Sequence, residues 1–319
     1  MNYTDDGYAA MLLTMALSPD REEYARPLSM PEFRAIMASA RRSRYGGLGK
    51  LLDADVSGLM MYLDLEEAEA LRVYTLLHRS VQLTYALEGL DREGIDAVTC
   101  FDPGYPQRLT RLLGDQAPAF FYWCGDRALL EKPAVAIVGI GGIRTDDDVR
   151  GAVEQLVSSA ARKGYAVITG GEPGVSRAAA GVADTCGGSI IDVVGGDLRR
   201  HIHLDGIAER IATGRGAALS LVHPDAMFTV VHAAARNKAL FALSEAAFIF
   251  NTDGRRGETG LLQNRVCKNV YAWEGCDANR GLFAHGATPF GPRAALDFDA
   301  LEQRWRVGSG EQMSMFDLL

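Results

Sequence analysis

The sequence predicts an α/β protein with a Rossmann-like, mostly parallel sheet that helices cover on both faces, preceded by a small helical domain. Three observations support this fold class. Hydrophobic strands alternate with helical segments between residues 131 and 292. These strands are apolar throughout, which is typical of parallel strands that are buried on both faces. The first three of them each end in glycines, where ligand-binding α/β domains turn from strand to helix.

We divide the 319 residues into four parts by these patterns. A helical N-terminal domain covers residues 1–90, and a connector covers residues 91–130. The Rossmann-like domain follows at residues 131–292, and a C-terminal tail occupies residues 293–319.

Composition narrows the class of function. The net charge of −8 argues against a protein that coats DNA broadly, because such proteins carry an excess of Lys and Arg. It leaves room for a local basic pocket on an acidic body. No apolar run is long enough to span a membrane, and the acidic N-terminus is unlike a signal peptide, so we expect a cytoplasmic protein. Five scattered cysteines without a CxxC pair predict reduced thiols and no zinc site.

The N-terminal domain is expected to contain one long helix over Glu66–Leu87. Apolar residues recur there at three- or four-residue spacing, with Asp64 as the expected cap and Gly89 after the last turn. The residues of this apolar face are Ala70, Tyr74, Leu77, Val81 and Tyr85. Earlier, Ala40–Leu52 joins a basic cluster to a glycine-rich turn. This segment is either a hairpin that contacts DNA phosphates or a loop between packed helices, and the poor spacing favours the loop.

The connector is expected to hold two strands. The segment IDAVTCFD alternates and ends at a turn, Asp102-Pro103-Gly104. After Tyr105-Pro106 and a short amphipathic run, AFFYWCG predicts an aromatic strand that Gly125 ends.

The Rossmann-like domain opens with the strand and glycines of Val135–Gly142. A helix over Asp146–Ala161, a strand over Tyr165–Thr169 and a helix through Ala178–Ala183 follow. Further strands are predicted at SIIDVVGGD, AALSLV, AAFIFNTD and KNVYAW. In such sheets ligands bind outside the carboxyl ends of the strands, and the three glycine turns all lie at that edge.

The first glycine turn contains Gly139, Gly141, Gly142 and Arg144. Glycine lets backbone N–H groups approach a phosphate, and the following helix N-terminus favours an anion. The acidic run Asp146–Asp148 would repel a phosphate placed directly above the helix. The turn is therefore either a phosphate contact, with Arg144 supplying charge, or a tight connection whose aspartates cap the helix.

The second glycine turn is the stronger candidate. It places Thr169, Gly170, Gly171, Gly174 and Ser176 in one strand-to-helix connection. Ser176 either contacts the ligand or caps the helix. Glu172 stands where an anion would bind, and it is expected to act as a general base or to hydrogen-bond a ribose or base edge.

Two further groups complete the candidate site. Arg236, Asn237 and Lys238 combine two cations with an amide, and Arg binds phosphate while Asn pairs with base edges. The turn GRRGETG contributes Thr259 and Gly260. Either group is also compatible with an ordinary surface. His201 and His203 have the spacing of ligands on one strand face, but no further ligand is close in sequence, so we predict neither a metal nor a cofactor.

Taken in order, these motifs resemble the DNA-processing protein A (DprA/Smf) family, over roughly residues 90–290. The motifs that carry the resemblance are Tyr105-Pro106-Gln107-Arg108-Leu109, Ala117-Pro118, Phe121–Gly125, Val135–Gly139, Ile168–Ser176, Arg236–Ser244 with Ala247–Phe250, Thr259–Leu262, and Leu282 with Gly286-Ala287. The chain departs from the family pattern where Pro173 or Glu172 replaces an arginine and where Asn251 replaces a glutamate.

The resemblance implies a non-enzymatic protein that binds single-stranded DNA in a basic pocket, forms a homodimer and hands the strand to a RecA-type recombinase. The expected binding residues are those of the glycine turns, Arg236–Lys238, Thr259 and Gly260. The departures leave a nucleotide ligand as the alternative, because this fold is similar to the SLOG superfamily. That superfamily includes LOG-like phosphoribohydrolases, whose PGGxGTxxE motif does not occur here.

The tail ends in GSGEQMSMFDLL, a flexible spacer followed by a short apolar segment. Its residues Gln312, Met315 and Phe316 resemble the pentapeptide with which bacterial proteins bind the DNA polymerase sliding clamp. The tail is therefore expected either to dock on the clamp or to fold back onto the protein's own core.

Overall fold

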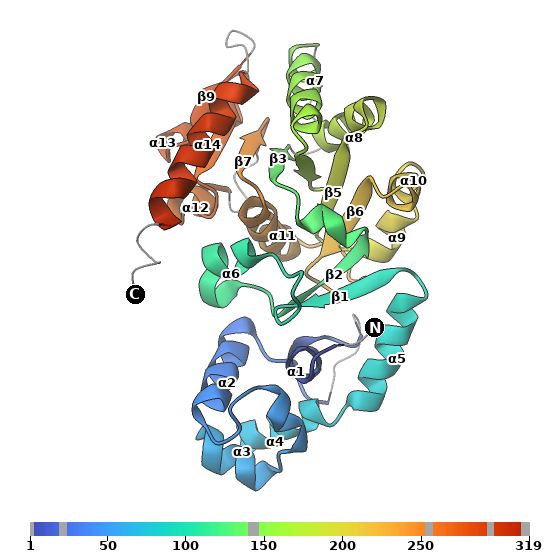
Figure 1. Ribbon diagram of the computed structural model, residues 1–319, viewed down its shortest axis with the longest axis vertical. Helices are drawn as coiled ribbons and strands as arrows, with labels where there is room; N and C mark the ends of the chain where they lie inside the picture. Colours follow the sequence, from blue (N-terminus) through green and yellow to red (C-terminus); the bar gives the residue numbers. More distant parts are fainter. Residues whose placement is uncertain (1–2, 19–23, 140–146, 253–257, 292–296, 314–319) are drawn as a thin grey trace.

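The computed structural model describes residues 3–18, 24–139, 147–252, 258–291 and 297–313, with residues 306–313 described by their backbone alone (Figure 1). No helix within this described part is long and apolar enough to cross a membrane.

The described residues form one nine-stranded sheet in the order β1-β2-β6-β5-β4-β3-β7-β8-β9. β2 pairs antiparallel with both β1 and β6, and every other pair of neighbours is parallel. The strands are β1 (Ile95–Thr99), β2 (Phe120–Gly125), β3 (Ala134–Val138), β4 (Ala166–Thr169), β5 (Ser189–Val194), β6 (Gly216–Ser220), β7 (Ala246–Ile249), β8 (Asn269–Trp273) and β9 (Thr288–Phe290).

Helices cover both faces of this sheet. One face packs against α7 (Asp147–Arg162), α8 (Val175–Cys186) and α14 (Phe298–Met313), with α9 (Leu198–Ile202) and α10 (Ile207–Ala212) beside β6. The other face packs against α6 (Gln107–Leu113), α11 (Val230–Leu243), α12 (Glu258–Gln263) and α13 (Arg280–Ala284). Short 3₁₀ turns are η2 (Gly114–Gln116), η3 (Arg127–Leu130) and η4 (Asp277–Asn279).

The central strand β3 shows why the sequence has to form a covered parallel sheet. All five of its residues are buried. Val135 and Ile137 face the core beneath α7 and α8, whereas Ala136 and Val138 face the core beneath α11. Because alternate side chains of a strand point to opposite faces, a strand without polar residues needs a cover on each side. The predicted fold class is confirmed.

The N-terminal domain lies at the lower end of the molecule in Figure 1, with a hydrophobic core of its own. It consists of α1 (Asp5–Thr14), α2 (Met30–Arg42), η1 (Gly49–Asp53), α3 (Val56–Leu63), α4 (Glu67–Leu77) and α5 (Ser80–Asp91). In the glycine-rich turn after α2, the Gly49 N–H donates to the Asp6 carboxylate at 2.6 Å. That N–H therefore serves packing, as the loop interpretation predicts.

The predicted single helix over residues 66–87 is wrong. The chain breaks between α4 and α5, where the buried Arg79 donates to the carbonyl oxygens of Leu12 and Met15 at the end of α1. The break turns the second half of the expected apolar face outward, so Val81 and Tyr85 are 64% and 71% exposed. Asp64 ends α3 in a left-handed conformation and does not cap α4.

The connector forms part of the sheet, since β1 and β2 extend it beyond β6. Tyr105 is buried and donates its hydroxyl to the Pro118 carbonyl at 2.7 Å, and burial raises the pKa of this phenol well above its usual value. Arg108 forms an ion pair with Glu245 and donates to the Ser244 carbonyl, directly before β7. The Tyr-Pro motif therefore joins the connector to the start of β7.

Part of the predicted tail belongs to the core. Phe298, Leu301 and Trp305 of α14 are buried against β7, β8 and α7. The helix runs on through residues 308–310, where the sequence predicts a flexible spacer. The amphipathic spacing of the three buried side chains, at i, i+3 and i+7, explains why the helix docks.

Asn279 offers a test of what holds the carboxyl ends of β7 and β8 together. It is fully buried, and its amide nitrogen lies within hydrogen-bond distance of the carbonyl oxygens of Ile249, Phe250 and Trp273. Asn279→Asp places a carboxylate against these acceptors, so we expect a loss of about 2–3 kcal/mol in the free energy of unfolding, measured by urea denaturation. The exposed Asn264→Asp is the control and should change it by less than about 0.5 kcal/mol. Equal effects would contradict this role for Asn279.

Candidate nucleic-acid interface

The chain reverses its direction across the sheet at β3. From β3 it proceeds through β4 and β5 to β6, then returns past β3 to β7 on the other side. A crevice at the carboxyl ends of the strands forms where the order reverses in this way. Gly139 lies there, and a Cβ on it would stand 2.9 Å from Asn251 Oδ1 and 3.0 Å from Val175 Cγ2. Glycine is needed because the ends of β3 and β7 and the start of α8 meet at this point.

The turn after β4 is held by a buried arginine of α11. Arg236 is 3% exposed; its Nη1 donates to the Gly170 carbonyl at 3.1 Å and lies 3.3 Å from Glu172 Oε1. Its Nε donates to Asn237 Oδ1 at 3.2 Å. A buried guanidinium needs such partners, because an uncompensated charge in the interior is costly. Arg236 thus holds the turn after β4 in place from the side of α11.

A second buried chain supports the same turn from the side of β5. The Gly171 N–H donates to Thr169 Oγ1 at 3.0 Å, and Thr169 in turn donates to Asp192 Oδ1 at 2.5 Å. The other oxygen of Asp192 lies 3.0 Å from Nε2 of His201, which comes from α9. Asp192 and His201 are 5% and 8% exposed. This network links β4, the neighbouring strand β5 and the helix α9 that follows β5.

Three of the predicted site residues lie in the interior. Arg236 and Asn237 are buried at 3% and 0% exposure, and Thr169 is fully buried. Lys238 is exposed on another side of α11, where its Nζ donates to Gln116 at 2.8 Å. Residues two apart on a helix point about 200° apart, so the predicted Arg-Asn-Lys cluster does not form one surface.

Ser176, Thr259 and Gly260 lie at other parts of the carboxyl edge. Ser176 is buried as well, at 4% exposure, and it does not cap α8, whose N-cap is Gly174. Thr259 and Gly260 are half-buried in α12. The residues Gly141, Gly142, Arg144, Met315 and Phe316 and the side chain of Gln312 lie outside the described part of the chain.

His201 and His203 do not share a face. They lie at the end of the short helix α9, not on a strand, so His201 points inward to Asp192 while His203 is exposed with its Nδ1 2.7 Å from the Arg199 carbonyl. Among the described residues, no group of three or more His, Cys, Asp or Glu side chains could hold a metal ion.

Sequence reasoning missed a row of arginines at this edge. Arg150, Arg177 and Arg200 are exposed, and each stands in the first turn of the helix that follows β3, β4 or β5. Within the described residues, the side chains of these three arginines form no hydrogen bond or ion pair with another residue. β3, β4 and β5 are neighbours in the sheet, so each of these arginines stands near the carboxyl end of one of three adjacent strands. The sequence did contain a signal for these residues. Each arginine stands two to four residues after the turn that follows a predicted strand, which places it near a helix N-terminus.

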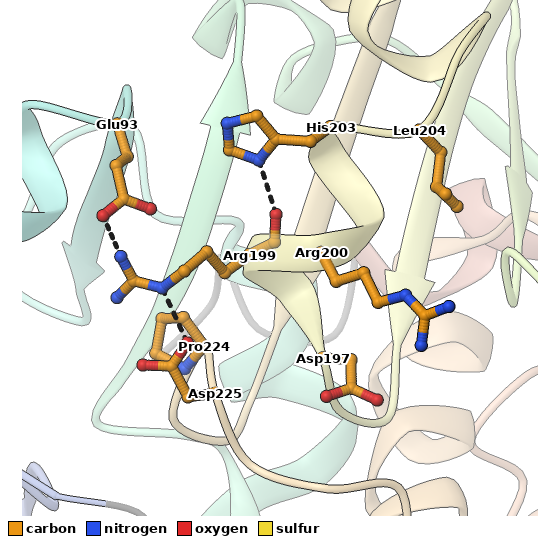
Figure 2. Close-up of a pocket in the computed structure, with 8 residues that line it drawn as sticks. All are labelled: Glu93, Asp197, Arg199, Arg200, His203, Leu204, Pro224 and Asp225. Atoms are coloured by element: carbon orange, nitrogen blue, oxygen red, sulfur yellow. Dashed lines mark hydrogen bonds and ion pairs between the residues drawn. The ribbon is translucent and has the colours of Figure 1, made fainter.

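Figure 2 shows how Arg200 differs from its neighbour Arg199. Arg199 forms ion pairs with Glu93 and with Asp225 at the rim of a cavity of about 620 Å³. Arg200 points the other way, free of both carboxylates. Arg199 therefore joins α9 to the turn before β1 and to the loop after β6, whereas Arg200 keeps its charge available to a ligand.

The sequence matches the family of DNA recombination-mediator protein A over residues 96–277, more than half of the chain. The chain belongs to this family. Membership of the family assigns it to DNA processing. No curated protein sequence matches the chain.

Solved structures show the same fold. DNA processing protein A from Streptococcus pneumoniae superposes with a TM-score of 0.62 at 17% identity, covering 91% of this chain and 95% of that one. DNA processing protein A from Helicobacter pylori, described for its single-stranded DNA binding mode, has a TM-score of 0.48 at 22% identity and covers 61% and 90% of the two chains. At 17% identity, the similarity to the Streptococcus protein shows the fold alone, over the 91% of this chain that it covers.

Gly171 gives a direct test of the turn. It has a φ of +68°, and a Cβ on it would lie 2.7 Å from Cε1 of the buried His201. We expect Gly171→Ala to lower the free energy of unfolding by about 2–3 kcal/mol, because it adds backbone strain to a steric clash. Chemical denaturation followed by circular dichroism measures the change.

Gly181→Ala is the matched control for this substitution. Gly181 lies in the middle of α8, where a Cβ would meet nothing within 4 Å. There the change should raise stability by about 0.5–1 kcal/mol, because alanine is the better helix former. A neutral Gly171→Ala variant would show that the turn adapts and that the network does not fix it.

Proposed function

We propose that the protein binds single-stranded DNA along the carboxyl edge of the sheet, without catalysing a reaction. The observation that carries the proposal is the row of exposed arginines, Arg150, Arg177 and Arg200, at the starts of three consecutive helices. Helix N-termini favour anions, and arginine side chains bind phosphate oxygens through paired N–H groups. Family membership makes the sugar–phosphate backbone of DNA the anion of choice.

The acidic body explains why this binding is local. The chain carries a net charge of −8, so a strand is repelled by most of its surface and attracted where cations gather. Arg236 and Asn237 take a different role from the one the sequence predicts. They are buried and position the turn after β4, so the strand meets the backbone of that turn and the arginines beside it.

Fluorescence anisotropy with a labelled oligothymidylate tests the proposal at two salt concentrations. Each phosphate that a cation contacts contributes about −0.7 to the slope of log K against log salt for a single strand. Arg177→Ala and Arg200→Ala should each weaken binding about three- to tenfold at low salt and reduce this slope by about that amount.

The control is Arg215→Ala. Arg215 directly precedes β6, so the same charge is removed at the opposite, amino edge of the sheet. The affinity of the Arg215→Ala variant for the oligothymidylate should match that of the unmodified protein. No binding at low salt, or equal losses in all three variants, would exclude a phosphate track at the carboxyl edge.

The sliding-clamp contact remains part of the proposal and depends on Gln312, Met315 and Phe316. A pull-down with a bacterial sliding clamp should retain the full chain and lose the variant that lacks residues 312–319. The double variant Gln312→Ala/Phe316→Ala should be lost as well, while Glu311→Ala, one residue outside the pentapeptide, should be retained. If the clamp still retained the truncated chain, the tail would not be the part of the protein that binds the clamp.

Two further partners follow from the family resemblance. We propose that the protein forms a homodimer, which size-exclusion chromatography with light scattering measures. We also propose that it passes the bound strand to a RecA-type recombinase. In a filament-formation assay, transfer of the DNA strand to the recombinase should then be weakened by Arg177→Ala and Arg200→Ala, the substitutions that weaken DNA binding.

A further inference from the structure

A second cavity of about 580 Å³ lies where the N-terminal domain, the connector and α11 meet. Its described lining comes from α1 and the residues after it, α2, α6, η2, β2, the loop after β6 and α11. Both the helical domain and the sheet are therefore needed to build it. Its volume is in the range of small-molecule sites, about 300–1,000 Å³.

The lining has a distinct chemical character. One part is apolar and half-buried, with Met30, Leu113 and Phe120 among its members. Another part is basic or hydrogen-bonding, with Lys238, His232 and His223. None of the described lining residues is an Asp or a Glu, although the chain has 41 of them. An acid-free lining with basic groups favours a ligand that is apolar in its body and anionic at one end.

The basic groups are held in place. Lys238 Nζ donates to Gln116 at 2.8 Å, and an ammonium group retains two further N–H donors after one such bond. The His232 ring Nδ1 lies 3.0 Å from the Met227 carbonyl, which fixes the ring. His223 packs edge-on against Tyr122 at 6.3 Å between ring centroids. Lys238 and His232 stand six residues apart on α11, about 120° apart around the helix axis. Ala235 lies between them, and all three residues line the cavity.

The position of the cavity points to the ligand. Leu221 and Val222 of its lining follow the carboxyl end of β6, so the cavity opens at the same edge as the row of arginines. It lies beyond that row, on the far side of β5. A flat nucleobase is apolar on its faces and stacks on aromatic side chains such as Phe120, and its phosphate is the anion that Lys238 would bind.

We propose that this cavity binds a nucleoside 5′-monophosphate, with the base among Met30, Leu113 and Phe120 and the phosphate at Lys238 and His232. A free nucleotide and the 5′-phosphorylated end of a DNA strand share this chemistry. The site is separate from the arginine row, and its occupation does not require a strand to lie along that row.

Isothermal titration calorimetry with dTMP and dAMP tests the proposal. Lys238→Gln removes an exposed charge and should weaken binding about tenfold, the loss expected for one charge-assisted hydrogen bond. Ala235→Phe fills the cavity from a half-buried position of α11 and should abolish binding. The control Lys132→Gln removes an exposed charge just before β3, at the opposite edge of the sheet, and should leave the affinity unchanged.

Competition separates the two sources of the ligand. A short oligonucleotide with a 5′-phosphate should displace the nucleotide more effectively than the same strand with a 5′-hydroxyl if the strand end is the natural ligand. If the two strands compete equally, and only at higher concentrations than free dTMP needs, the free nucleotide is the natural ligand. Either result supports the site.

The proposal is overturned if neither nucleotide binds saturably below about 1 mM. It is also overturned if they bind but Lys238→Gln and Ala235→Phe have no effect, because the site then lies elsewhere. These outcomes are independent of strand binding: Arg177→Ala should leave nucleotide affinity unchanged while it weakens the oligothymidylate complex. Loss of nucleotide binding in Arg177→Ala would likewise contradict a separate cavity.

Discussion

The carboxyl edge of the sheet depends on the buried guanidinium of Arg236. It contacts the Gly170 carbonyl and Glu172, and no space remains beside it, since a Cβ on Gly170 would lie 2.6 Å from its Nη1. A charge at this depth is tolerated only when its partners are fixed in place. The turn after β4, the start of α8 and the first half of α11 are thereby constrained together, and this packing positions Arg177 in the first turn of α8.

A second consequence concerns how a basic surface arises on an acidic chain. The sequence concentrates no run of Lys or Arg at the edge. The fold instead places Arg150, Arg177 and Arg200 at the starts of the three helices that follow the adjacent strands β3, β4 and β5. The buried Arg79 and Arg236 and the half-buried Arg108 meanwhile serve the packing, so the number of basic residues says little about the charge that a ligand meets.

Local periodicity predicted the Rossmann-like core well, because strands such as Val135–Val138 are apolar on both faces and leave few alternatives. It failed where tertiary contacts decide. The break between α4 and α5 follows from the place of Arg79 under α1, sixty-seven residues away from Leu12 in sequence. The Arg236–Lys238 motif lies on one helix, α11, but its side chains separate around that helix, with Arg236 and Asn237 buried and Lys238 exposed. Asp192 is the one carboxylate in the strand β5, and a carboxylate in a buried strand indicates a hydrogen-bond network. It belongs to none of the motifs that the sequence shows.

The two margins of the sheet are closed in different ways. β1 is covered by α1 and α5, and four of its five residues are buried. At the other margin β9 has only three residues, and Pro289 at its centre has no backbone N–H to offer to an incoming strand. Short, proline-containing and covered edges are how sheet proteins avoid adding strands from other molecules. Neither margin therefore offers a long, open row of backbone groups to a strand of another copy.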